Sequence, residues 1–263
     1  MTPSELFQAG KLADAVAAAL DTVKKNPMDT SRRALLGDLL CYQGDWERAD
    51  KQFDAISTQD TQLAIGVGLI RQILRAESAR AEFYSVGRAP EVVEEVSPRM
   101  QLHLLASIAC REANWAEAAR LLEEAEAMRP APRGTCDGQP FSDLRDLDDL
   151  TSSFFEVLTS TGKYYWIPFE RVQVIEFRKP ERPRDLLWRR ARMIVNGGPD
   201  GEVYLPAVYP STQQRGDDGL RLGRATDWWQ ETGGPVRGLG QRMLLVGDEA
   251  RPFHSLGTIE FEM

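Results

Sequence analysis

Apolar residues in the first half of the chain recur at helical spacing. Trp46, Ala49 and Phe53 lie three or four positions apart, which places them on one face of a helix. Gly44 precedes this segment, and a residue without a Cβ atom tolerates the sharp turn between two helices. The pattern therefore predicts a helical hairpin with one helix on each side of Gly44.

The same short pattern returns along the chain at a fixed distance. Gly10 and Gly44 are 34 residues apart, and so are Ala15 and Ala49, while a third similar segment follows about two periods later. These residue types at these offsets resemble the tetratricopeptide repeat (TPR), whose hairpins stack into a curved solenoid. Residues 1–130 are therefore predicted to be a domain of TPR-like helical hairpins.

One stretch, 64–98, has the length of a further unit but breaks the pattern. Arg80 stands where a large apolar residue is expected, and Phe83 stands where a small one is expected. The stretch still predicts a helix over about 62–84. Two interpretations remain open, namely a degenerate repeat held by its neighbours and an irregularity that shapes a binding surface.

The concave face of a solenoid suits a partner helix or an extended peptide. Only side chains of each first helix that point away from the hairpin packing can line that face. By spacing, they are Asp38, Cys41 and Tyr42 in the second unit, Ile65, Gly68 and Gln72 in the irregular unit, and His103, Ser107 and Arg111 in the last unit. These are the predicted partner-binding residues, and the alternative is that several of them are simply solvated.

The pattern changes after a segment rich in proline and glycine. Residues 131–142 are predicted to be a linker, and 143–263 a second domain in which short runs of Val, Ile, Tyr, Trp and Phe alternate with turn signals. The predicted strands are 154–159, 164–167, 172–177, 187–195, 202–206, 240–246 and 258–262. The turn cluster between the fourth and fifth predicts a hairpin. The expected fold class is α+β, with helical hairpins followed by a small β-rich sheet or barrel.

The densest polar cluster, 143–149, holds four aspartates. It lacks the glycine and the bidentate glutamate of an EF-hand loop, so no metal site is predicted, although cation binding stays an alternative. Leucines at 144, 147 and 150 favour a short helix whose acids pair with the arginines of 171–192. The predicted structural polar network is Asp143, Arg145, Asp146, Asp148, Asp149, Arg184, Asp185, Arg224 and Asp227.

Composition and charge narrow the function classes. The net charge of −8 argues against nucleic acid as the main partner. No apolar run approaches the length of a membrane span, no secretory signal begins the chain, and three scattered cysteines suit a reducing compartment, so a cytoplasmic protein is expected. With two histidines and no nucleophile or metal motif, the chain is predicted to be non-enzymatic and to need no cofactor. A ligand-binding or enzymatic second domain and a nucleic-acid-binding regulator are the alternatives.

Six ordered blocks of the second half carry a family resemblance. They are 141–149, 162–169, 183–189, 201–207, 222–228 and 238–242. Together they resemble the ImpE family, also called TagJ or SciE-type. The resemblance implies a cytoplasmic accessory protein of the bacterial type VI secretion system. It further implies binding to the N-terminal helix of the small contractile-sheath subunit (TssB-like), association with the sheath-disassembling AAA+ ATPase (ClpV-like), and no catalytic residues.

Overall fold

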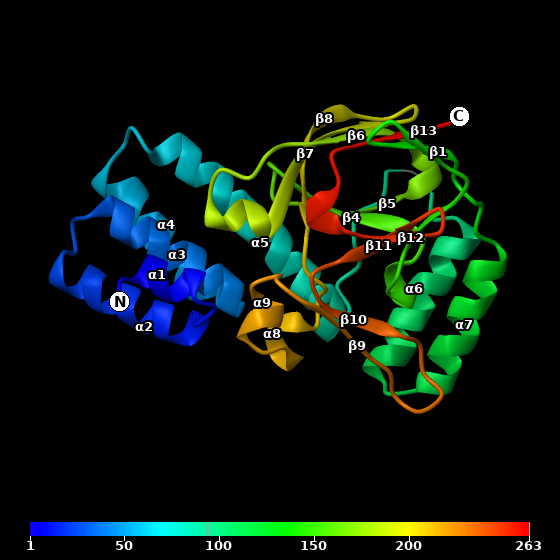
Figure 1. The fold of residues 1–263 in the computed structure, drawn as a ribbon, viewed down its shortest axis with the longest axis horizontal. Helices are drawn as coiled ribbons and strands as arrows, with labels where there is room; N and C mark the ends of the chain where they lie inside the picture. Colours follow the sequence, from blue (N-terminus) through cyan, green and yellow to red (C-terminus); the bar gives the residue numbers. More distant parts are fainter. Residues whose placement is uncertain (94, 263) are drawn as a thin grey trace.

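The computed structural model describes residues 1–93 and 95–262, which form a helical part followed by a strand-rich part (Figure 1). This is the α+β arrangement that the sequence predicts. The helices are α1 Pro3–Gln8, α2 Leu12–Lys25, α3 Thr30–Gln43, α4 Trp46–Gln59, α5 Ala64–Val86, α6 Pro98–Arg111, α7 Trp115–Ala127, α8 Thr212–Arg215 and α9 Asp218–Arg221. Among the described residues, none of these helices is both long and apolar enough to cross a membrane.

The helical hairpins form where the repeat pattern predicts them. Gly44 ends α3 in the left-handed region, with φ of +75°, and its N–H is bonded to carbonyls of the last turn. Gly10 makes the corresponding turn between α1 and α2. A Cβ atom added to Gly37 of α3 would lie 2.7 Å from the ring of Phe53 in α4, so the two helices of this hairpin are in close contact.

The irregular unit is a single helix, α5, which packs on the sheet. Phe83 lies edge-on against Trp166 of a strand at the edge of the sheet, with ring centroids 4.8 Å apart. Arg80 pairs with Glu156 on the neighbouring strand. Both residues that break the repeat pattern therefore contact the second half of the chain.

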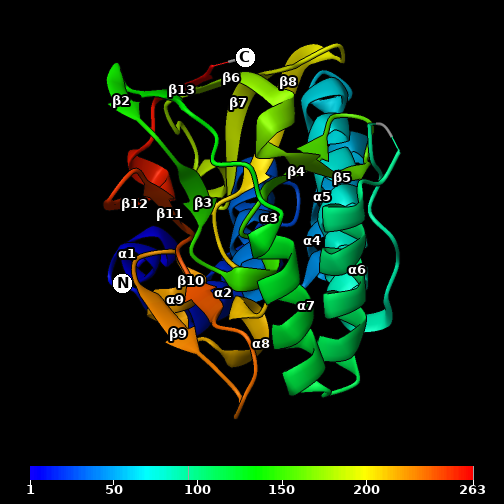
Figure 2. The same cartoon turned by 90° about the vertical axis from the view of Figure 1, so that its right-hand side faces the viewer.

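Eight strands form an open antiparallel sheet in the order β2-β1-β13-β6-β7-β8-β4-β5. The strands of the protein are β1 Gly134–Cys136, β2 Gln139–Phe141, β3 Leu144–Asp146, β4 Phe154–Thr159, β5 Tyr164–Pro168, β6 Val172–Phe177, β7 Trp188–Val195, β8 Asp200–Pro206, β9 Thr226–Trp229, β10 Arg237–Gly240, β11 Met243–Val246, β12 Glu249–Pro252 and β13 Thr258–Phe261. β12, β11 and β3 form a second sheet, and β9 pairs with β10. Figure 2 shows α6 and α7 side by side, with the β9–β10 hairpin near their lower end.

Most strand predictions are confirmed, including the β7–β8 hairpin. The predicted strand 240–246 is confirmed only from Met243, where β11 begins. Its predicted start is wrong, because Gly240, with φ of +77°, is the last residue of β10. The segment 131–142, predicted to be a linker, contains β1 and β2. Gly138, with φ of +78°, lies in the tight turn between β1 and β2, whereas Gly134 and Pro140 lie within these strands, so the segment is part of the large sheet.

The main hydrophobic core is shared by the two halves. One buried cluster combines Leu36 and Phe53 of the hairpins with Phe154, Trp166 and Trp188 of the sheet. A second cluster lies within the strand-rich half. Because burial of apolar surface is the main driving force of folding, the helical repeats and the sheet stabilise each other.

Candidate functional site

A network of buried charges joins α5 to the sheet. The Arg80 guanidinium donates two parallel hydrogen bonds of 2.9 Å to the Glu156 carboxylate and one of 3.0 Å to Glu77. Burial lowers the pKa of Arg80, but the two carboxylates outweigh burial and raise it well above its usual value. Burial raises the pKa of Glu156, yet Arg80 and Arg242 outweigh it, so the carboxyl stays ionised.

The network continues to Asp146 of β3. Arg242 donates to Asp146 at 2.7 Å and also to Glu156. Tyr84 and Tyr164 each donate a hydroxyl hydrogen bond to Glu156. Desolvation raises the pKa of Asp146 to about 6 in spite of Arg242. Every one of these carboxylates already has cationic or hydroxyl partners, so the network is built to hold the two halves together.

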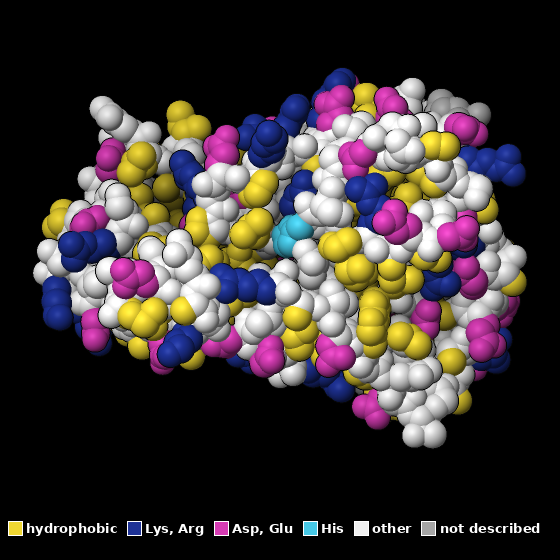
Figure 3. Space-filling model, viewed as in Figure 1, with side chains coloured by type: hydrophobic (Ala, Val, Ile, Leu, Met, Phe, Trp, Pro, Cys, Tyr) yellow, Lys and Arg dark blue, Asp and Glu magenta, His cyan; other side chains and the backbone are white. Residues whose placement is uncertain are grey.

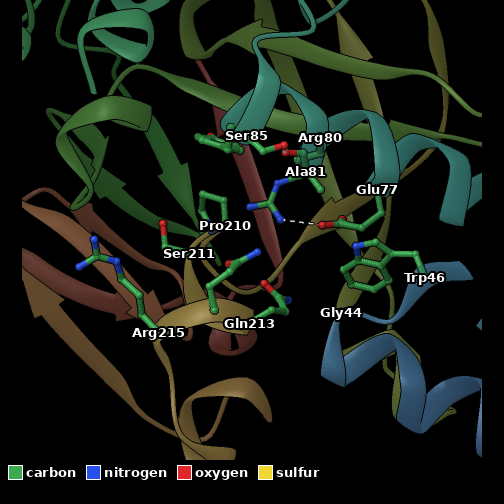
Figure 4. Close-up of a pocket in the computed structure, with 12 residues that line it drawn as sticks. Gly44, Trp46, Glu77, Arg80, Ala81, Ser85, Pro210, Ser211, Gln213 and Arg215 are labelled. Atoms are coloured by element: carbon green, nitrogen blue, oxygen red, sulfur yellow. Dashed lines mark hydrogen bonds and ion pairs between the residues drawn. The ribbon is translucent and has the colours of Figure 1, made fainter. Parts of the chain in front are cut away.

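A cleft of about 290 Å³ lies beside this network, between the α3–α4 turn, α5 and α8 (Figure 4). Figure 4 shows Arg80 reaching toward Glu77, with Trp46 on one side and Ser211 and Gln213 opposite. None of the described residues that line the cleft is a histidine or a cysteine. The cleft therefore offers no imidazole base or thiol nucleophile.

A second opening, which we call the cationic groove, lies between α5 and the β6–β7 connection. Its volume is about 420 Å³. It is lined by Gly66, Leu69, Ile70, Ile73, Arg178, Lys179, Glu181, Arg182, Arg184, Asp185, Trp188, Arg190 and Tyr204. The groove thus has an apolar floor and a rim of five cationic and two acidic side chains. Figure 3 shows Lys and Arg side chains at the upper edge of the molecule, over the junction between α5 and the sheet.

Five of the predicted partner-binding residues are buried, which is a correction to the expectation of an open concave face. They are Asp38, Cys41, Tyr42, His103 and Ser107. The strand-rich half occupies that face. Arg184 donates to Asp38 at 2.7 Å, and the Tyr42 hydroxyl donates to the Pro183 carbonyl.

The other four predicted partner-binding residues lie nearer the surface. Ile65, at 89% exposure, is almost fully solvated, and an added Cβ at Gly68 would meet open space. Gln72 lies beside the β4–β5 turn, and Arg111 donates to the Phe83 carbonyl. The α5 residues that line the cationic groove are Gly66, Leu69, Ile70 and Ile73, so Ile65 and Gly68 are not part of its lining, and their binding role stays a prediction.

The predicted helix over the aspartate cluster is wrong. Residues 144–146 form β3, and a short 3₁₀ helix, η1 Asp149–Thr151, follows. β3 pairs with β11, which satisfies its backbone and places Leu144 in the core, although the leucine spacing also fits a helix. The spacing of the three leucines alone does not distinguish a helix from a strand in this segment.

The aspartates are ion-paired, but to other arginines than those predicted. Asp143 pairs with Arg129, Asp149 with Arg145, Asp148 with Arg237 and Asp146 with Arg242. None of these partners belongs to the basic stretch 171–192. The described residues include no cluster of three or more side chains suited to a metal ion.

The remaining members of the predicted polar network fix local structure. Arg184 pairs with Asp38 of α3, and Asp185 accepts from the backbone of Glu181 and Arg182. Arg224 donates to the carbonyls at the end of α1. The Asp227 carboxylate accepts from the next backbone N–H along the chain. Arg184 and Arg224 thus tie the N-terminal helices to the second half.

The fold defines a two-part α+β protein in which helical hairpins share a hydrophobic core with an open sheet. The family model described as ImpE protein matches residues 138–260. The chain is 30% identical over all 263 residues to the type VI secretion system accessory component TagJ of Pseudomonas aeruginosa, and the match covers 92% of that protein. The chain belongs to the ImpE/TagJ family.

A solved structure agrees with this assignment. The crystal structure of a protein from Vibrio parahaemolyticus superposes with a TM-score of 0.94 at 25% sequence identity. The similarity covers 99% of this chain and 97% of that one. The helical part, the sheet and their junction therefore recur together in that protein.

Proposed function

We propose that this protein is a non-enzymatic adaptor of a bacterial type VI secretion system. The observation that carries the proposal is its similarity to TagJ along the whole chain, which includes both the hairpins and the sheet. Such an adaptor acts in the bacterial cytoplasm. The paired state of the buried carboxylates fits a structural role for them, because a general base needs a free, suitably placed group.

The proposed partners are the N-terminal helix of the small sheath subunit (TssB-like) and the AAA+ ATPase that disassembles the sheath (ClpV-like). Support for a helix as ligand comes from the shape of the surface. An amphipathic helix binds by laying its apolar face into a groove, and the cationic groove offers an apolar floor that runs along α5. By holding both partners, the adaptor would bring the ATPase to the sheath.

Coelution on a size-exclusion column tests this function. The full chain is mixed with the small sheath subunit encoded by the same secretion system, either intact or without its N-terminal helix. We expect coelution with the intact subunit and separate peaks after deletion of the helix. A complex that forms equally well without the helix, or no complex with either form, would contradict the proposal. The same column run with the ATPase tests the second partner.

A further inference from the structure

We propose that the cationic groove is the docking site and that it takes an amphipathic helix with acidic residues along one flank. This inference rests on the proposed adaptor function and adds the site and the chemistry of the partner. The groove lies between α5 and the segment 178–190, so both halves of the chain contribute to it. A partner helix bound here would contact both halves at once.

The floor of the groove is apolar and firmly held. On α5 the groove runs from Gly66 to Ile73, which is about two turns or roughly 11 Å, and Leu69, Ile70 and Ile73 supply its apolar side chains. Trp188 and Tyr204 come from β7 and β8, and both are buried. A rigid floor of this length matches two turns of a partner helix that presents apolar residues at i, i+3, i+4 and i+7.

The positive charge of the groove's rim favours a partner helix that has acidic residues beside its apolar face. Arg178, Lys179 and Arg182 are exposed, and none of them forms an ion pair with any described residue. Arg190 pairs with Glu202 at 2.5 Å, so it is already neutralised. These three cations beside an apolar floor are complementary to carboxylates of a partner. They form a local positive patch although the net charge of the molecule is −8.

The structure also disfavours the other surfaces considered for a partner. The concave face of the hairpins is filled by the sheet, which buries Asp38 and Tyr42. In the cleft of Figure 4, Arg80 is occupied by Glu77 and Glu156. Beside the cationic groove, in contrast, Ile65 is solvated, and a Cβ added to Gly66 would meet open space, so a helix can approach α5 closely.

Fluorescence anisotropy with a labelled peptide of the small sheath subunit's N-terminal helix tests the site on the full chain. The groove variant is Arg178→Glu with Lys179→Glu. Its matched control is Lys24→Glu with Lys25→Glu, which changes the net charge equally on exposed residues of α2. We expect the groove variant to bind at least about tenfold more weakly and the control to stay within about twofold of the unchanged protein. The affinity of the unchanged protein should fall as salt rises.

The apolar part of the site has its own variant. Gly66→Leu places a side chain at the end of the groove on an exposed turn of α5, where the added Cβ meets no neighbour, so a melting temperature equal to or above that of the unchanged protein is expected. We expect this variant to lose peptide binding. Ala116→Leu, on an exposed position of α7, is the control and should bind normally.

The results of these experiments distinguish failure of the proposed docking site from failure of the proposed adaptor function. Equal binding by the unchanged protein and both groove variants would overturn the site and leave the adaptor function standing. No binding by the unchanged protein would overturn both. A labelled single-stranded oligonucleotide serves as the probe for nucleic acid. If it binds the unchanged protein, competes with the peptide and does not bind the Arg178→Glu, Lys179→Glu variant, the ligand of the groove is nucleic acid and not a helix.

Discussion

Arg80 of α5 and Glu156 of β4 form a buried, two-pronged ion pair across 76 residues of sequence, with both hydrogen bonds at 2.9 Å. This pair explains why the third repeat departs from the TPR pattern. At this position a TPR hairpin has a large apolar residue that packs against the next hairpin. This chain instead has Arg80, which pairs with Glu156 of the sheet. The helical repeat is therefore adapted to a β partner within its own chain.

Removal of the Arg80 side chain should destabilise the protein strongly. In Arg80→Leu, Glu156 keeps the Tyr84 and Tyr164 hydroxyls but only one of its two cationic partners, Arg242, and Glu77 loses its cationic partner, while both carboxylates remain buried. Breaking a buried ion pair from one side costs about 3–5 kcal/mol. Urea unfolding followed by circular dichroism measures this loss.

An exposed arginine supplies the control for that substitution. Arg120 on α7 pairs with Glu117 and Glu124 in solvent. Arg120→Ala should leave the unfolding midpoint nearly unchanged, because exposed ion pairs contribute little. Equal stability of the two variants would show that the Arg80 pair does not hold the halves together.

His103 should make the protein sensitive to mild acid. Its Nδ1 lies 3.0 Å from the Leu150 carbonyl, and its Nε2 lies 2.9 Å from the Ser153 hydroxyl. The neutral ring satisfies both contacts when Nδ1 donates and Nε2 accepts. Burial, with a smaller effect from Arg99, lowers the pKa of His103 to about 3.

The sign of the pH effect follows from proton binding. Below pH 6.5 the unfolded chain binds a proton at His103 and the folded chain does not, so stability falls as pH falls toward 3. At pH 5 the loss from this group is about 2 kcal/mol relative to pH 7. Asp146, with its pKa raised to about 6, increases the stability of the folded state as pH falls from about 6 to 4, which opposes the effect of His103. The contribution of His103 therefore has to be measured as the difference between the unchanged protein and a His103 variant.

The measurement compares unfolding free energies at pH 7 and pH 5 for the unchanged protein and for His103→Gln. The amide can donate and accept like the neutral ring but does not titrate. We expect the variant to lose about 2 kcal/mol less than the unchanged protein between the two pH values. Equal losses would mean that His103 is protonated in the folded state or exposed.

Replacement by alanine should change the stability of the protein in opposite directions at two glycines of the helical part. An added Cβ at Gly68 of α5 meets open space, so Gly68→Ala should stabilise the protein by about 0.5–1 kcal/mol. The Cβ of Gly37→Ala would lie 2.7 Å from the buried ring of Phe53. That overpacking should cost about 1–3 kcal/mol. Thermal melts of the two variants would contradict the hairpin packing if both shifted in the same direction.

The contact between Asp38 and Arg184 should couple the N-terminal hairpins to the second half. Desolvation raises the pKa of Asp38, and Arg184 opposes that rise. A double-mutant cycle with Asp38→Ala and Arg184→Ala should give a coupling energy of about 0.5–3 kcal/mol. Additive effects would show that the two side chains do not interact in solution.

Local patterns predicted the hairpins and most strands, because each depends on spacing within a short segment. The turns at Gly10 and Gly44 and the β7–β8 hairpin are of this kind. Patterns of this sort also predicted a helix over Leu144 and Leu147, where pairing with the distant β11 gave β3 instead. Tertiary pairing overrode spacing there.

The partner-facing residues could not be derived from spacing for a similar reason. The repeat pattern shows which side of a helix is free of its own hairpin, but it does not show that the sheet will cover that side. Tyr42 and His103 were thus placed on an open face and are buried. The arginines of 171–192 are evident in the sequence, but only the folded structure shows that part of this stretch lies beside Ile70 of α5.

Hydrogen–deuterium exchange on the full chain, alone and with the intact small sheath subunit, locates the surface that the subunit covers. We expect slower exchange on binding in the first turns of α5, around Gly66–Ile73, and in 178–190, with little change in α6 and α7. Protection confined to α6 and α7, or no protection anywhere at saturating subunit, would contradict the claim that this protein is an adaptor that binds through the cationic groove.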